Sequence, residues 1–274
     1  MLAAALDLAA DRLAQARAAG MDVVACGVGS AGTVDAKGVV THATDALPGW
    51  RGTDLTTAFA DRLGLPVTVL NDVHAWGLGE ARHGAAKGSR LALVLTIGTG
   101  VGGALVRDGE LLRGRYGMAG SLGHTPALFP TTHAATGPST GTDIDTARPC
   151  PCGAAGHLEA YAAGPAILAA YRARGGTAAD LRDLAGTADP VALQVIHEAA
   201  GFLGRSIAAA TTLLDPDVIV LGGGVTGLGD LLTVPLTEAV RRHTPPGLGP
   251  IPVRLSTLGP HGAVLGAASA AFTP

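Results

Sequence analysis

The stretch LALVLTIGTGVGGALVRDG, residues 91–109, decides the fold class of this chain. Residues 91–97 form an unbroken apolar run, which is typical of a buried strand. The glycine-rich segment Gly98-Thr99-Gly100-Val101-Gly102-Gly103 follows, and residues 104–109 predict another strand. The N–H groups of such a turn can bind phosphate, although the Gly-Lys-Ser/Thr ending of a Walker loop is missing. A tight glycine hairpin explains the same residues equally well.

Strand and helix patterns alternate along the rest of the chain. Helical patterns occupy residues 2–19, 54–63, 73–82, 189–214 and 261–271, and short strand-like runs occupy 22–28, 66–70, 217–221 and 251–255. Thr53-Asp54 predicts a cap for the second helix, whereas residues 126–149 predict an irregular loop. Alternation of this kind predicts an α/β fold with a mostly parallel sheet and helices on both faces.

The composition narrows the class of protein. The 274 residues carry a net charge of -3 without a basic stripe, so no nucleic-acid partner is expected. No run of about 18 apolar residues predicts a membrane span, and no positively charged segment precedes the first apolar stretch as a signal peptide requires. We therefore expect a cytoplasmic protein. The odd number of cysteines, three, argues against a disulfide framework.

A polar pair, Asn71-Asp72, ends the strand expected at 66–70. Ligands of α/β folds bind at the carboxyl ends of parallel strands, where Asp72 could accept a hydroxyl proton and Asn71 could hydrogen-bond a polyol. Asn and Asp are also the preferred N-cap residues, and on these two residues alone capping is the better explanation.

A glycine triplet, Gly222-Gly223-Gly224, follows the strand expected at 217–221. Backbone without side chains could wrap an adenine or a ribose at this strand end. Taken alone, a plain turn explains the triplet better.

Two cysteines and two histidines have the spacing of a metal site. Cys150 and Cys152 are two residues apart, His157 follows five residues later, and His124 precedes the pair by 26 residues. Sulfur and imidazole nitrogen are the ligands that zinc prefers, and a full Cys2His2 set would make the metal structural. Two reduced surface thiols beside unrelated histidines are the alternative.

Taken in order, these elements resemble the ROK family of sugar kinases and sugar-responsive repressors over residues 1–271. The family pattern reads G-V-G-x-x-G, L-P-G-W, N-D followed by G-E, G-T-G-x-G-G, E-x-G-H, C-x-C-G-x-x-G-C-x-E and L-G-G-G. The matching segments here are residues 27–32, 47–50, 71–80, 98–103, 121–124, 150–159 and 221–224. Each motif is weak alone, but their order and spacing together are specific.

The resemblance implies an actin/hexokinase-type fold, with two RNase H-like α/β lobes around a cleft. We expect the lobes at residues 1–90 and 91–274, the second one carrying the zinc-binding loop. A sugar would lie at the base of the cleft and ATP, with Mg²⁺, across its mouth. A homodimer is expected at the level of the family.

The resemblance also implies residue roles. Asp72 would be the general base for a sugar hydroxyl. The implied sugar contacts are Asn71, Gly49, Ser121, His124 and Glu159; the implied nucleotide contacts are Gly98, Thr99, Gly100, Gly102, Gly222, Gly223 and Gly224. The implied structural zinc would be held by His124, Cys150, Cys152 and His157.

Three departures from the family pattern bear on activity. The D-x-G-G-T turn of the family kinases has no counterpart before residue 22, so we expect an incomplete amino-terminal lobe with an open sheet edge. Ser121 stands where E-x-G-H has its glutamate, and His157 replaces the last cysteine of the zinc motif.

Two functions remain compatible with these motifs. One is an ATP-dependent kinase for a hexose or N-acetylhexosamine. The other is a non-catalytic sugar-binding protein of the same family, a pseudokinase or a sensor derived from a repressor, for which Ser121 is the supporting residue.

Overall fold

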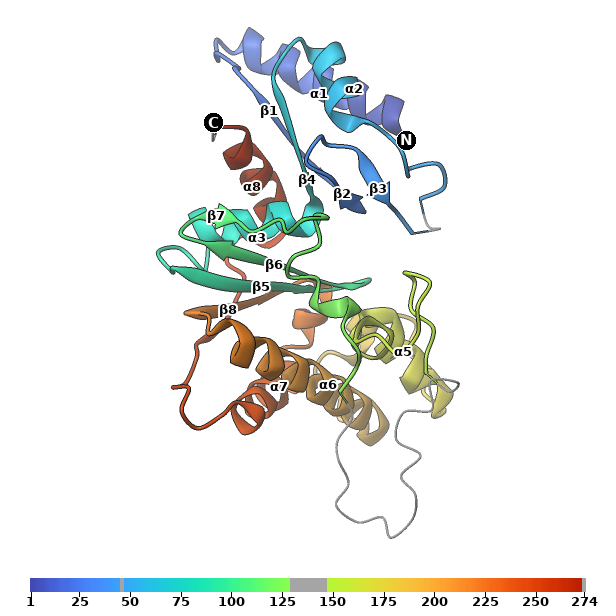
Figure 1. Cartoon of the computed structure of the whole chain (residues 1–274). Helices are drawn as coiled ribbons and strands as arrows, with labels where there is room; N and C mark the ends of the chain where they lie inside the picture. The colour runs from blue at the N-terminus through green and yellow to red at the C-terminus, as the bar shows by residue number, and fades with distance from the viewer. Residues whose placement is uncertain (45–46, 129–146, 273–274) are drawn as a thin grey trace.

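The computed structural model describes residues 1–44, 47–128 and 147–272 (Figure 1). The α-helices are α1 (Leu2–Ala18), α2 (Leu55–Leu63), α3 (Asp72–His83), α4 (Glu159–Ala162), α5 (Gly164–Ala173), α6 (Pro190–Leu214), α7 (Asp230–His243) and α8 (Gly262–Ala271). The strands are β1 (Cys26–Ser30), β2 (Thr33–Val34), β3 (Val40–His42), β4 (Val67–Asn71), β5 (Leu91–Ile97), β6 (Val101–Arg107), β7 (Glu110–Leu111), β8 (Val218–Gly222) and β9 (Val253–Leu255). Among these residues, no helix combines the length and apolar character that crossing a bilayer requires.

A five-stranded sheet with the order β7-β6-β5-β8-β9 forms the larger half of the molecule. Strand β5 pairs in parallel with β8 and antiparallel with β6, and Ile97 lies opposite Val101. The expectation of a mostly parallel sheet is therefore wrong for β6 and β7. The three residues 98–100 between β5 and β6 are too few for a crossover and can only reverse the chain.

Alternate residues of β5 enter two different cores. Leu93, Leu95 and Ile97 pack with buried residues of α6 and α7, whereas Ala92 and Val94 pack with α3 and α8. Successive side chains of a strand point to opposite faces, so an apolar run at every position builds a sheet that is covered on both sides. This arrangement confirms helices on both faces.

Helices α3 and α8 form a layer between the five-stranded sheet and the smaller half of the molecule (Figure 1). Their backbones touch, because a Cβ on Gly79 would overlap the carbonyl of Gly262 and a Cβ on Gly266 would overlap the carbonyl of Ala75. The carboxyl-terminal helix thus returns to the strands of the first half, and the division into lobes 1–90 and 91–274 stays a prediction.

The smaller half contains the parallel pair β1 and β4, the hairpin-like pair β2 and β3, and helices α1 and α2 (Figure 1). Within the described residues β1 pairs with β4 alone, so its other edge is open, as the sequence predicted. The strand expected at 22–28 lies at 26–30 instead. Its ladder begins where Cys26 donates to the carbonyl of Pro66, while the side chain of Val24 stays exposed.

The other expected elements lie within two residues of their predicted positions, apart from β6. That strand begins at Val101, inside the segment that the sequence assigned to a turn. The cap predicted at Asp54 is confirmed, since its carboxylate accepts the N–H of Thr57 at 2.9 Å. Residues 129–146 of the expected loop lie outside the described ranges.

A fully buried carboxylate, that of Glu80 in α3, joins the segment after α3 to the segment after β9. It accepts the N–H of Ala85 at 2.8 Å and the N–H of Leu258 at 3.2 Å, and it also accepts the hydroxyl of Ser256. A buried carboxylate is costly unless it is hydrogen-bonded, and these three donors supply that compensation.

We predict that Glu80→Gln lowers the free energy of unfolding by about 1–3 kcal/mol, because the amide nitrogen would face a backbone N–H that it cannot accept. Urea denaturation of both proteins measures the difference. The exposed Glu238→Gln makes the same chemical change on α7 and should shift stability by less than about 0.5 kcal/mol. Equal stability of the Glu80 variant and the parent would contradict this role for the carboxylate.

Candidate active site

The carboxyl ends of β1 and β4 lie side by side, with Ser30 opposite Asn71 in the parallel register. The indole N–H of Trp50 donates to the hydroxyl of Ser30 at 3.0 Å, so the segment 47–50 lies over this edge of the sheet. Gly49, in the same segment, is exposed and has no atom within 4 Å of a built Cβ. The structure therefore leaves open space beside the strand end that the sequence singled out.

Asn71 is the N-cap of α3, as its residue type predicted. Its Oδ1 accepts the N–H groups of Val73 and His74 at 3.0 and 3.1 Å. Its Nδ2 donates to the carbonyl of Gly32 and to Oδ1 of Asp72, both at 2.9 Å. The side-chain amide therefore has all its hydrogen-bonding positions filled from within the chain.

Asp72 is the first residue of α3, and its side chain is exposed at the strand end. Its Oδ1 accepts from Asn71 and from the N–H of Val73, and among the described residues no other residue donates to Oδ2. Desolvation by the surrounding protein raises the pKa of Asp72, and the hydrogen bonds from Val73 and Asn71 oppose that shift. One carboxylate oxygen is thus fixed, while the other is available to a ligand.

The two glycine-rich segments are neighbours because β5 and β8 are paired strands. Thr96 lies opposite Gly222, and a Cβ on Gly98 would lie 3.8 Å from the N–H nitrogen of Gly224. The parallel register places both strand ends at one edge of the sheet, which is where α/β folds bind ligands. The structure therefore brings together two segments that are about 120 residues apart in the chain, 98–103 and 222–224.

Packing alone requires several of these glycines. A Cβ on Gly100 would lie 2.5 Å from the carboxylate of Glu159, and one on Gly102 would lie 2.7 Å from Val73. Gly223 has a φ of 89° and lies directly on the carbonyl of Ile97. Gly224 faces open space, and Thr99 is exposed. Residues 98–99 and Gly224 are thus the parts of the two segments that a nucleotide can approach.

The four expected metal ligands form one cluster. One ligand atom from each of His124, Cys150, Cys152 and His157 can be chosen so that all four lie within 4.8 Å of one another. Sγ of Cys152 is 3.2 Å from Nδ1 of His157, and Sγ of Cys150 is 3.9 Å from Nδ1 of His124. Ligand atoms around a tetrahedral zinc lie about 3.3–3.8 Å apart, since the bonds to the metal are about 2.0–2.3 Å long. The donor set fits a zinc ion, and the two measured distances lie close to that range.

Burial and neighbouring charges shift the pKa values of two residues of the cluster. Burial raises the pKa of Cys150 to about 12, and the nearby Cys152 and Glu159 contribute to the rise. Burial lowers the pKa of His124, Glu159 opposes that shift, and the imidazoles of His157 and His42 add to it. A divalent cation would reverse this balance by favouring thiolate and neutral imidazole.

Glu159 joins the metal cluster to the glycine turn. Its Oε2 accepts the N–H of Val101 at 2.8 Å, and its Oε1 lies 3.8 Å from Sγ of Cys150. The carboxylate expected to bind sugar is therefore held against the end of β5 and the start of β6. This contact has no signal in the sequence, because Glu159 and Val101 are 58 residues apart.

Ser121 precedes the short helix η1 (Leu122–His124), and no side-chain hydrogen bond of Ser121 is found among the described residues. Three further residues belong to this region, although the sequence did not single out their side chains. Ser30 contacts Trp50, the charge of His42 acts on His124, and buried His74 lies two residues after Asp72. Ser30 and His74 lie inside matched motifs, each at a variable position, whereas His42 lies in none.

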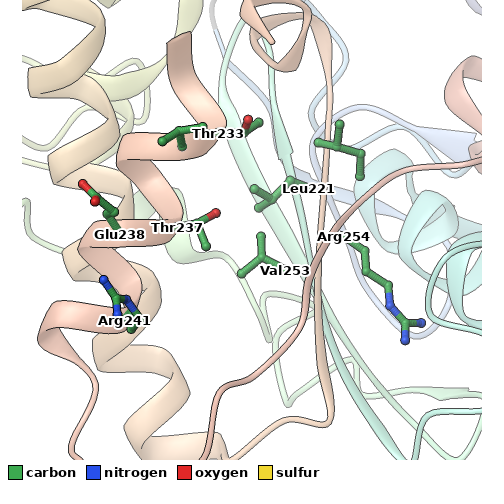
Figure 2. A pocket seen from close by; sticks show the side chains of 9 residues that line it. Leu221, Thr233, Thr237, Glu238, Arg241, Val253 and Arg254 are labelled. Atoms are coloured by element: carbon green, nitrogen blue, oxygen red, sulfur yellow. The ribbon is translucent and has the colours of Figure 1, made fainter. Parts of the chain in front are cut away.

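A groove of about 420 Å³ lies elsewhere, between α7 and the edge strand β9 (Figure 2). Thr237, Glu238 and Arg241 line it from α7, and Val253 and Arg254 line it from β9. None of the expected site residues lines this groove, so its position does not bear on the site described above.

Known proteins resemble this chain along nearly its whole length. The model of the ROK family matches residues 3–273. A glucokinase of Halalkalibacterium halodurans is 33% identical over 264 residues, which are 89% of this chain and 75% of that protein. The crystal structure of a ROK hexokinase from Thermus thermophilus has a TM-score of 0.81 at 35% identity and covers 98% of this chain and 85% of that one. A ROK family glucokinase from Streptomyces griseus, in complex with glucose and AMPPNP, has a TM-score of 0.78 at 30% identity and covers 97% and 86%. The expected hexokinase-type fold is confirmed.

We predict about one zinc per chain in protein purified without chelator, because four donors of the types that zinc prefers already lie within 4.8 Å of one another. Elemental analysis of the parent and of Cys150→Ser and Cys152→Ser measures the metal content, which should fall well below one per chain in both variants. Cys26→Ser is the matched control, since Cys26 lies in β1 outside the cluster, and it should keep the metal. A metal-free parent, or full occupancy in the Cys150 variant, would refute the site.

Proposed function

Because this chain belongs to the ROK family, we propose that it transfers the terminal phosphate of ATP to a hydroxyl of a hexose or N-acetylhexosamine. Glucose is the first sugar to test, since one similar structure holds glucose and an ATP analogue. The observation that carries the proposal is the placement of Asp72. Its carboxylate lies at the end of β4 with Oδ2 available to a ligand. Two glycine segments suited to bind phosphate and nucleotide lie side by side at the ends of the paired strands β5 and β8.

The proposed reaction needs one proton acceptor and accurate positioning. The sugar hydroxyl donates its proton to Oδ2 of Asp72 as its oxygen attacks the terminal phosphorus, and ADP leaves from the opposite side. Phosphoryl transfer depends more on alignment and charge neutralisation than on covalent help from the protein. Asn71 supports this role indirectly, since its amide holds Oδ1 and thereby directs Oδ2 outward.

The remaining residues are assigned by their contacts. His124, Glu159 and Ser121 flank the metal cluster and the glycine turn, which supports their proposed contacts with the sugar. Residues 98–99 and Gly224 would hold the nucleotide, and Mg²⁺ would neutralise the phosphates. Zn²⁺ would be structural. By holding Cys150 in place it would fix the segment from Cys150 to Glu159, so that Oε1 of Glu159 stays beside Cys150 and Oε2 stays bonded to Val101.

A non-catalytic sugar-binding protein of the same family is the second candidate. Ser121 favours it, since a hydroxyl is a weaker sugar acceptor than the glutamate of the family pattern. Release of ADP with Mg-ATP and a panel of hexoses and N-acetylhexosamines separates the two. Turnover on one sugar supports the kinase, whereas binding seen by calorimetry without turnover supports the second candidate.

We predict that Asp72→Asn lowers kcat at least about 100-fold while sugar binding persists, because the amide cannot accept the hydroxyl proton but keeps the shape of the side chain. Coupled ADP-release kinetics and calorimetry measure the two quantities. Asp61→Asn, an identical change on the exposed face of α2, should leave both unchanged. Parent-like turnover in the Asp72 variant would show that another group is the base.

The pH dependence of sugar turnover should report the same carboxylate. A general base works only when ionised, and desolvation by the surrounding protein raises the pKa of Asp72 above its ordinary value of 3.8. The acid limb of kcat/KM for the sugar, measured at saturating Mg-ATP, should therefore have an apparent pKa above 3.8. Circular dichroism at each pH checks that the fold persists, and a profile that stays flat down to that value would contradict the assignment.

A further inference from the structure

The side chain of His74 lies between the first turn of α3 and the segment that begins at Ala119. It belongs to the first turn of α3, two residues after Asp72, and it is only 4% exposed. The preceding Val73 packs on Gly102, at 2.7 Å from the position of a Cβ there. On its other side, Nε2 of His74 is 3.0 Å from the carbonyl oxygen of Ala119.

The hydrogen bond to Ala119 fixes the state of the imidazole. A carbonyl only accepts, so Nε2 must carry the proton in this contact. Burial lowers the pKa of His74, the bond to Ala119 opposes that shift, the charge of Arg113 adds to it, and that of Asp72 opposes it. The ring is therefore a neutral, buried donor.

The segment that His74 holds leads directly into two of the proposed sugar contacts. Gly120 and Ser121 follow Ala119, and η1 then carries His124. This segment lies against β6 without intervening side chains, because a Cβ on Gly120 would overlap Ala104 and one on Gly123 would overlap the carbonyl of Val101. Among the described residues, the bond from His74 is the side-chain hydrogen bond that joins the first turn of α3 to this segment.

We propose that His74 is a positioning residue, which sets the distance between the carboxylate of Asp72 and the sugar-binding segment 119–124 through its hydrogen bond to Ala119. This inference rests on the proposed function, because it concerns the geometry of that same site. Asp72 precedes His74 on a helix that the Asn71 cap holds in register. A shift of the carbonyl of Ala119 would therefore move Ser121 and His124 relative to the base, and it would leave the turn at 98–100 in place.

Three variants separate positioning from a merely structural role. His74→Gln places an amide N–H donor at about the position of Nε2. His74→Asn has the same amide, but its side chain is too short to reach the carbonyl of Ala119. His74→Leu fills a similar volume without a donor. For Leu and Asn we expect kcat/KM for the sugar to fall about tenfold, which corresponds to about 1.4 kcal/mol, with KM for ATP unchanged. The Gln variant should stay within about threefold of the parent.

Hydrogen exchange provides a readout that needs no substrate. The amides of His124 and Thr125 are bonded within the segment, to Ser121 and Leu122. Exchange over residues 119–125, followed by mass spectrometry, should accelerate in the Leu and Asn variants and return to the parent rate in Gln. Equal exchange in all four proteins, or a Gln variant as impaired as Leu, would overturn the proposal.

The same measurements keep the two proposals distinguishable. Asp72→Asn should abolish turnover without changing exchange over 119–125. If the parent proves non-catalytic, the proposed kinase function fails, but the positioning role is still judged by exchange and by the dissociation constant of the sugar. Unchanged exchange in the Leu variant of an active parent would refute the role of His74 and leave the kinase assignment intact.

Discussion

The contact between the backbones of α3 and α8 is the constraint on which the rest of the structure depends. Gly79, Gly262 and Gly266 let the two helices approach until carbonyl groups meet Cα atoms. The pair fills the space between the β1–β4 sheet and the five-stranded sheet, and Gly27 of β1 lies on the carbonyl of Ala267 in the same way. Because α3 begins at Asp72, the depth of this packing also sets where the proposed base stands.

The second constraint is the parallel pairing of the strands that carry the site. Pairing of β1 with β4 puts Ser30 beside Asn71, and pairing of β5 with β8 puts Thr96 beside Gly222. The functional segments leave the carboxyl ends of these strands and so converge, although they are far apart in the chain. Some glycines at these strand ends are required for packing, and another leaves space for a ligand. Gly100 and Gly102 make room for Glu159 and Val73, whereas Gly224 remains open to a ligand.

Two polar contacts and one apolar contact connect the metal cluster to the helix that carries the proposed base. Cys150 lies beside Glu159, Glu159 accepts from Val101 at the start of β6, and Gly102 of that strand packs on Val73 of α3. A metal bound by His124, Cys150, Cys152 and His157 would therefore do more than stabilise a loop. It would fix the carboxylate of Glu159, since that side chain lies between the cluster and the glycine turn.

The sequence by itself determined the order and type of most elements, because apolar periodicity and local capping are short-range signals. The strand at 91–97, the long helix ending at Leu214 and the caps at Asp54 and Asn71 were all readable from neighbouring residues. The grouping of His124 with Cys150, Cys152 and His157 was readable as well, because thiol and imidazole spacing limits the chemistry to a few metals.

Only the tertiary structure decided which side chains serve the site and which serve the packing. Nothing around Glu159 predicts its bond to Val101, and nothing around His74 predicts its bond to Ala119, since each pair is brought together by the fold across more than 40 residues. The start of β6 within the glycine segment and the return of α8 to β1 were likewise decided by closure of the sheets. Local patterns determine the secondary structure of a segment, whereas the fold determines its tertiary contacts. The chemistry of the site depends on those contacts.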